Sequence, residues 1–202
     1  MRSRKPFAGR RPGPLLLLLG LALACSGSDL NRATRPDVAG VEDLEGRPLD
    51  PFDDVQRGTV LIFARSDCPI SNRYAPEIRR ITERFTAEGV RFWLVYPDDD
   101  DTSEVIRAHA GSFGYTQTAV RDRRHALVKA AGVRVTPEVA VFDAQGRLLY
   151  AGRIDDQYVD FGKRRATPTV RNLENAIVAL LAGRAPATPR TTAIGCTISP
   201  AS

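Results

Sequence analysis

The pattern of apolar and polar positions along the chain predicts alternating strands and helices. Residues 59–64 and 90–96 are continuous apolar runs of the length that suits buried central strands. Residues 75–85 instead place their apolar side chains at the spacing of one helix face. Comparable patterns predict the remaining elements: strands over 117–120, 139–142 and 148–152, and helices over about 102–113, over 123–131 and from Thr167-Pro168 to Gly183. This order predicts an α/β sheet covered by helices on both faces.

Two further segments have a less regular pattern. Residues 38–43 and 47–49 flank Glu45-Gly46, which predicts a hairpin. Residues 98–101 are consecutive aspartates, but they lack the alternating ligands and the glycine of an EF-hand loop. We therefore expect a solvated loop that leads into a helix cap.

The first 24 residues have the pattern of a signal peptide. A basic stretch precedes residues 15–24, an apolar run that is too short to span a bilayer as a helix. The run ends in Ala22-Leu23-Ala24, with small residues where a signal peptidase reads them, and Cys25 follows at once. This site resembles the lipobox of bacterial lipoproteins, so we expect lipidation of Cys25, with plain secretion as the alternative. Residues 25–36 then form a tether of low apolar content.

The signal segment also accounts for the net charge of +5. Five of the 29 Lys and Arg residues and none of the 24 acids lie before residue 25, so the rest of the chain carries 24 of each. A neutral mature protein gives no support to a nucleic-acid partner. We expect an exported bacterial protein in the cell envelope, facing the periplasm or the exterior, where disulfides persist. Its membrane contact would be through the lipid anchor alone.

Cys68 is the first candidate for chemistry because it stands directly between the strand over 59–64 and a helix. A thiol at a helix N-terminus faces unpaired N–H groups and the positive end of the helix dipole, and both stabilise the thiolate. Arg65 would add to this effect, whereas Asp67 would oppose it. The alternative is a buried structural cysteine.

Two short motifs resemble the site of thioredoxin-fold proteins. One is Cys68-Pro69-Ile70-Ser71 at the start of a helix, with Pro76 farther along it. The other is Thr136-Pro137, which precedes the strand over 139–142 in the manner of that fold's cis-proline loop. The resemblance implies that four residues shape the site, with the backbone of Thr136 presented to an incoming peptide: Pro69, Ser71, Thr136 and Pro137.

The resemblance extends over nearly the whole mature chain. The extra strand and helix over 90–115 are similar to the insertion of the redoxin branch (AhpC/TSA and TlpA-like). The chain further resembles the peroxiredoxin-like redoxins of bacterial envelopes over four segments: 67–77, 135–143, 152–156 and 195–198. This implies a thioredoxin-like redoxin domain over 37–184, with a central mixed sheet flanked by helices. An extended C-terminal tail follows over 185–202.

The chain departs from the motifs of three known activities. Ser71 replaces the second cysteine of a dithiol thioredoxin motif, and a hydroxyl cannot resolve a mixed disulfide. Leu61 and Arg65 replace the Pro and Thr of the peroxiredoxin motif, and Asn72 replaces the second cysteine of a Sco-type copper chaperone. The resemblance therefore implies none of these activities intact.

Cys196 becomes decisive because, with Cys25 lipidated, Cys68 and Cys196 are the two remaining thiols. We expect Cys68 to attack a partner disulfide or to be oxidised to sulfenic acid, and Cys196 to resolve the adduct. This describes a thiol–disulfide oxidoreductase or a peroxiredoxin-like antioxidant protein without a cofactor. Its partners would be protein thiols and disulfides or a small oxidant. Alternatively, Cys196 is a structural staple or a free thiol.

Two other hypotheses remain open from the sequence. One is a copper-binding, metallochaperone-like module that uses Cys68, Cys196 and His125 and serves an envelope metalloprotein. The other is a catalytically silent interaction scaffold. His109 is interpreted as a packing or surface residue, and Asp155-Asp156 as structural.

Overall fold

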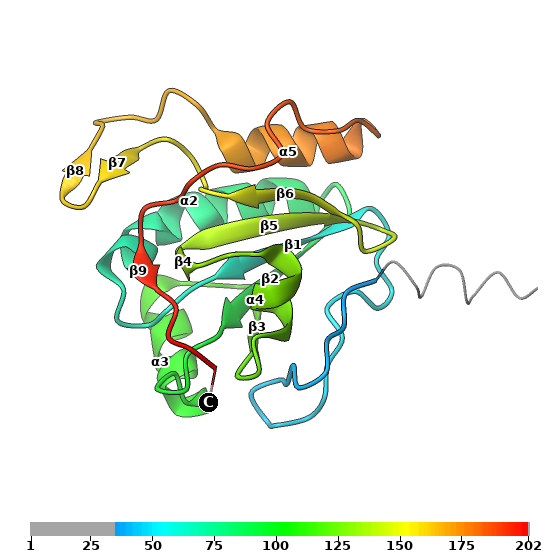
Figure 1. Cartoon of the computed structure of the whole chain (residues 1–202), viewed down its shortest axis with the longest axis vertical. Coiled ribbons are helices and arrows are strands. Elements are labelled where there is room, and N and C mark those ends of the chain that lie inside the picture. The colour runs from blue at the N-terminus through cyan, green and yellow to red at the C-terminus, as the bar shows by residue number, and fades with distance from the viewer. Residues whose placement is uncertain (1–34, 202) are drawn as a thin grey trace, which may run out of the picture.

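A central five-stranded sheet organises the protein. The structure is a computed structural model that describes residues 35–201, so the predicted signal peptide and Cys25 lie outside the described residues. The sheet comprises β1 (Gly58–Phe63), β2 (Val90–Tyr96), β3 (Thr118–Arg121), β5 (Glu138–Asp143) and β6 (Leu148–Gly152). Their spatial order is β3-β2-β1-β5-β6, and β1 is parallel to β2 but antiparallel to β5 (Figure 1). The predicted mixed α/β sheet is confirmed.

The helices and short strands surround this sheet. The helices in the described residues are α2 (Pro69–Thr86), α3 (Ser103–Phe113), α4 (Ala126–Ala131) and α5 (Asn172–Leu181). Two small ribbons pair β4 (Val135–Thr136) with β9 (Cys196–Thr197), and β7 (Tyr158–Asp160) with β8 (Lys163–Arg164). Within residues 35–201, no helix combines the length and the apolarity needed to cross a membrane.

The side chains of β1 alternate between two apolar layers. Val60 and Ile62 pack in the cluster that includes α2 and α5, whereas Leu61 and Phe63 pack in the cluster that includes α4. All four side chains are buried, because helices cover both faces of this central strand. The parallel strands β1, β2 and β3 end at one edge of the sheet, where the loops that follow them meet.

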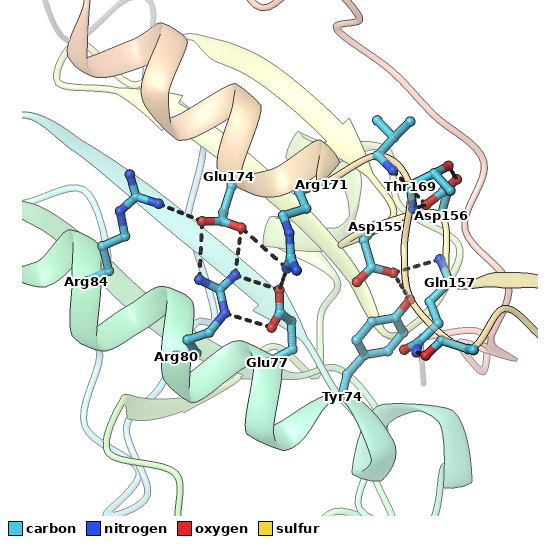
Figure 2. Close-up of polar contacts among 12 residues, drawn as sticks. Tyr74, Glu77, Arg80, Arg84, Asp155, Asp156, Gln157, Thr169, Arg171 and Glu174 are labelled. Carbon is cyan, nitrogen blue, oxygen red and sulfur yellow. Dashed lines mark hydrogen bonds and ion pairs between the residues drawn. The ribbon is translucent and has the colours of Figure 1, made fainter.

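Ion pairs join helix α2 to helix α5 (Figure 2). Glu174 of α5 accepts hydrogen bonds from Arg80 at 2.6 Å and from Arg84 at 2.8 Å, both on α2. Arg171, just before α5, donates to Glu77 of α2 at 2.8 Å. Charge-assisted hydrogen bonds of this kind are stronger than neutral ones, and the Glu174 side chain is only 8% exposed. The network fixes α2 firmly against α5.

The C-terminal tail, residues 185–201 of the described chain, runs along the free edge of β6 (Figure 1). The Ala151 N–H donates to the Pro189 carbonyl at 3.0 Å, and the Thr191 N–H donates to the Ala151 carbonyl at 3.1 Å. Arg190 donates to the Ala131 carbonyl at the end of α4, at 2.9 Å. The tail therefore covers backbone groups that an edge strand would otherwise leave unpaired.

Helix α2 starts at Pro69, as the Cys68-Pro69-Ile70-Ser71 motif predicts, although the apolar spacing alone marks only residues 75–85. Two other helices begin later than the sequence pattern indicates. Helix α5 starts at Asn172 rather than at 168, because the Asp156 carboxylate accepts the N–H groups of residues 169 and 170. Helix α4 starts after His125, whose φ of +55° interrupts the helical backbone.

Two other segments also differ from the prediction. The expected hairpin over 38–49 is present in a minimal form, with one antiparallel bridge between Glu42 and Pro48 and a turn in which the Asp43 carboxylate accepts the Arg47 N–H. The β7–β8 hairpin was not predicted. It leaves Val159 and Phe161 exposed, so it lacks the alternation by which half-buried strands are recognised.

Candidate active site at the start of helix α2

Cys68 lies at the carboxyl edge of the sheet as the N-cap residue of α2. Its side chain is fully buried, and Pro69 occupies the first helical position. The protonated Cys68 thiol donates to the Thr136 carbonyl at 3.1 Å. Within residues 35–201 no side chain caps this helix, so the free N–H groups of its first turn are available to the sulfur.

The second predicted motif forms the facing wall. Thr136 is buried and belongs to β4, and the Thr136–Pro137 peptide bond is cis, the isomer that the resemblance implies. Glu138, the first residue of β5, accepts the Arg134 N–H at 2.8 Å and so holds the loop that carries β4. The structure thus brings Pro69, Ser71, Thr136 and Pro137 around Cys68.

The tail brings Cys196 to the same place. Strand β9 pairs antiparallel with β4, with Cys196 opposite Thr136, and the half-buried Cys196 packs against the apolar cluster that contains Cys68. Both cysteines are free thiols in this structure. The preceding residue has to be small, because a Cβ on Gly195 would lie 2.2 Å from the Thr136 carbonyl oxygen.

The two neighbouring thiols have opposite acidities. Burial raises the pKa of Cys68, but hydrogen bonds from the Cys196 thiol and from the backbone and hydroxyl of Ser71 outweigh it, so the pKa falls below its ordinary value. The pKa of Cys196 rises to about 12, through burial, its hydrogen bond to Cys68 and the charge of the Cys68 thiolate. The two shifts favour the thiolate on Cys68 and the proton on Cys196.

Ser71 has a defined place in this arrangement. Its hydroxyl is buried and makes no hydrogen bond of standard geometry within residues 35–201, yet it is close enough to the Cys68 sulfur to lower the pKa of that thiol. A buried hydroxyl without a partner costs free energy, and the Cys68 thiolate would provide the missing acceptor. Ser71 therefore favours the thiolate, although it cannot act as a second thiol.

Two aspartates of the loop after β2, Asp98 and Asp101, are buried, whereas Asp99 and Asp100 are exposed, so the expected solvated loop is only partly correct. Asp98 accepts the Ser199 N–H of the tail at 3.1 Å, and Asp101 accepts the Ser66 N–H at 3.3 Å. Burial raises the pKa of Asp101. The helix cap is Thr102, whose hydroxyl accepts the Val105 N–H. These carboxylates position the loop before Cys68 and the end of the tail.

The structure does not bring His125 to the two thiols. Its buried imidazole forms a hydrogen bond with the Pro97 carbonyl at 3.1 Å. No group of three His, Cys, Asp or Glu residues suited to hold a metal occurs in the described part of the chain. The set of Cys68, Cys196 and His125 is therefore not assembled as a ligand group here.

A polar network behind the site was missed at the level of sequence. His109 of α3 contacts the Tyr96 hydroxyl at 2.7 Å and the side-chain carbonyl of Asn72 at 2.8 Å. Asn72 then donates to the Ser66 carbonyl at 3.1 Å, which ties the loop before Cys68 to α2. Burial lowers the pKa of His109, so the neutral imidazole is favoured. In the sequence, the one sign of this network was the position of Asn72, four residues after Cys68.

These features, a mixed sheet with a cysteine at the start of its first helix and a cis-proline loop against it, define a protein of the thioredoxin fold. The sequence profile described as Redoxin matches residues 33–175. The chain belongs to the Redoxin family. The match ends before the tail, so Cys196 lies outside the segment that the family profile describes.

Solved structures share this fold. An uncharacterized conserved protein from Geobacillus kaustophilus has 24% identity and a TM-score of 0.69, over 82% of this chain and 89% of that chain. A hypothetical protein from Sinorhizobium meliloti 1021 has 24% identity and a TM-score of 0.69, over 82% of this chain and 92% of that one. A putative thioredoxin from Neisseria meningitidis has 21% identity and a TM-score of 0.52, over 68% and 83%. No curated protein matches the sequence.

Proposed function

We propose that this redoxin is a thiol–disulfide oxidoreductase in which Cys68 is the nucleophile and Cys196 is the resolving thiol. The observation that carries the proposal is the pairing of β9 with β4, which sets a thiol of raised pKa beside a thiol of lowered pKa. Because the resolving cysteine comes from the tail, the site does not need a second cysteine at position 71.

The reaction is a pair of thiol–disulfide exchanges. The Cys68 thiolate attacks one sulfur of a partner disulfide, so that a Cys68–partner bond forms and the partner's own S–S bond breaks. The partner sulfur that leaves takes up a proton. Cys196 then loses its proton and attacks Cys68, which forms the Cys68–Cys196 disulfide and releases the second partner thiol. The partner is reduced by two electrons and this chain is oxidised by two; the reverse sequence oxidises a partner dithiol.

The other functions considered have less support. Arg65 stands where the related peroxidase motif has Thr and has no hydroxyl, and its guanidinium pairs with Asp67 at 2.7 Å, so the group that would hold a peroxide is missing at this position. The copper-binding alternative is not favoured, because the His125 imidazole is engaged with Pro97. Protein thiols and disulfides are therefore the proposed partners, and the chemistry needs no cofactor.

The proposal is tested by replacing each thiol in turn. Cys68→Ser should reduce exchange with a chromogenic aromatic disulfide to background. Cys196→Ser should keep the first exchange but accumulate mixed disulfides, which non-reducing gels and intact mass would detect. Oxidation of the unmodified chain should yield a Cys68–Cys196 peptide after digestion. Unchanged turnover in Cys68→Ser, or an oxidised protein without that peptide, would contradict the assigned roles.

We also propose export and lipidation at Cys25, from the sequence of the first 25 residues. The full chain expressed in a bacterium should enter the detergent phase on phase separation, and Cys25→Ala should move it to the aqueous phase. Aqueous partition of both forms outside the cytoplasm would leave plain secretion instead.

A further inference from the structure

The edge of β4 is covered by a segment of the chain's own tail that behaves as a bound peptide. Cys196 and Thr197 pair with Thr136 and Val135. The ladder continues one step outside the strands, because the Ile198 N–H donates to the Arg134 carbonyl at 3.0 Å. The result is a short extended peptide, docked antiparallel, with its cysteine beside Cys68.

Three features of this edge select what can lie on it. The backbone groups of Arg134–Thr136 require an extended segment. The close approach of Gly195 to the Thr136 carbonyl, 2.2 Å for an added Cβ, requires glycine directly before the cysteine. Ile198 is 9% exposed in the cluster beneath it, so the second residue after the cysteine is apolar.

The tail segment over the edge is held by different contacts on its two sides. Upstream, tail residues 190–193 and Arg134 and Val135 line a cavity of about 390 Å³, while Arg190 donates to the Ala131 and Gly132 carbonyls. Downstream, its hold beyond Ile198 is the hydrogen bond from the Ser199 N–H to Asp98 at 3.1 Å. The hydrogen bond from the Thr191 N–H to the Ala151 carbonyl holds the tail firmly, but it lies upstream of the tail segment 195–198 that covers Cys68.

We infer that the Arg134–Thr136 edge is a binding site for an extended partner segment of the pattern Gly-Cys-x-apolar, and that tail residues 195–198 compete for it. This inference rests on the proposed function and names its substrate class. One edge cannot hold two strands in the same register. The tail therefore leaves when a partner cysteine binds, and its return brings Cys196 to Cys68 as the partner strand departs. Resolution of the mixed disulfide and release of the partner become one event.

The test uses full-length protein with Cys25→Ser and Cys196→Ser, so that Cys68 is the reporting thiol. Two synthetic peptides serve as probes: Ala-Ile-Gly-Cys-Thr-Ile-Ser and the same peptide with Ala in place of Gly. Both carry the same chromogenic leaving group in disulfide linkage to the cysteine. Adding Gly195→Ala to the protein should displace the tail and speed the reaction with the glycine peptide about tenfold, which corresponds to about 1.4 kcal/mol. Gly111→Ala is the matched control, since a Cβ there meets nothing within 4 Å.

On the Gly195→Ala protein, the glycine peptide should react about tenfold faster than the alanine peptide, a factor equal to about 1.4 kcal/mol. Both should react equally with free glutathione. A chain that ends at Ala193 provides a second way to remove the tail, and circular dichroism checks folding of both. Equal rates for the two peptides, or no difference between Gly195→Ala and Gly111→Ala, would overturn the inference. If Cys68 reacts with the small aromatic disulfide no faster than glutathione does, the proposed function itself fails.

Discussion

Two segments beside Cys68 are held by contacts of different kinds. Helix α2 is joined to α5 by ion pairs around the buried carboxylate of Glu174 (Figure 2). The tail is joined to β4 by a two-residue backbone ladder and to neighbouring residues by a few single hydrogen bonds. The first set demands particular side chains and is strong, whereas any extended backbone can replace the second. The comparison indicates that α2, fixed against α5, is a stable platform for Cys68. The tail strand β9, which lies beside it, is exchangeable.

The largest effect on the platform is expected from Glu174→Gln. The change leaves Arg84 without its charged acceptor and Arg80 with Glu77 alone, and we expect a loss of about 2 kcal/mol in the free energy of unfolding, measured with urea. Glu88→Gln, at an exposed acid with no ion pair found in the described region, should change it far less. The alkylation rate of Cys68 should stay the same in both variants. A parallel loss of thiol reactivity would show that the platform and the site are not separable.

A smaller effect is expected at the thiols when Cys196 is replaced by Ala. The Cys68 thiolate then loses the hydrogen bond from its neighbour, so the pKa of Cys68 rises and the pH profile of its alkylation moves to higher pH. Near neutral pH the rate should fall about tenfold, because a hydrogen bond to a charged group contributes about 1.5 kcal/mol or more. Cys196→Ser keeps an O–H donor and should shift the profile less. A shift to lower pH would contradict the role assigned to this bond.

The smallest effect is expected from Asp98→Ala, which removes the acceptor for Ser199. The tail segment should open more often, and hydrogen exchange of the Ile198 amide should accelerate about threefold, as the loss of a weak hydrogen bond implies. The Leu173 amide, which donates to Ile154 at 2.9 Å beside α5, is the internal reference and should not change. Equal acceleration at both amides would mean that the strand and the platform open together.

The sequence was sufficient to predict the parts of the site that follow from the order of neighbouring residues along the chain. A buried strand followed by Cys68 and Pro69 specifies a thiol at a helix start, and Thr136-Pro137 specifies the facing loop. The path of the tail could not be predicted, because its hold depends on single backbone hydrogen bonds that leave no periodic pattern. The buried carboxylates of Asp98 and Asp101 were misread for a related reason, since their partners are backbone N–H groups far along the chain.

The beginning of the described chain lies at the opposite end of the sheet from the thiols. Arg35 contacts Gly146 in the turn between β5 and β6, and β5 runs from beside Phe63 to beside Gly58 (Figure 1). The length of β1, about 20 Å for six residues, therefore separates the two ends. The anchor proposed at Cys25 would therefore join the domain at the end of the sheet that points away from Cys68, and the end that carries the thiols would stay open to a partner.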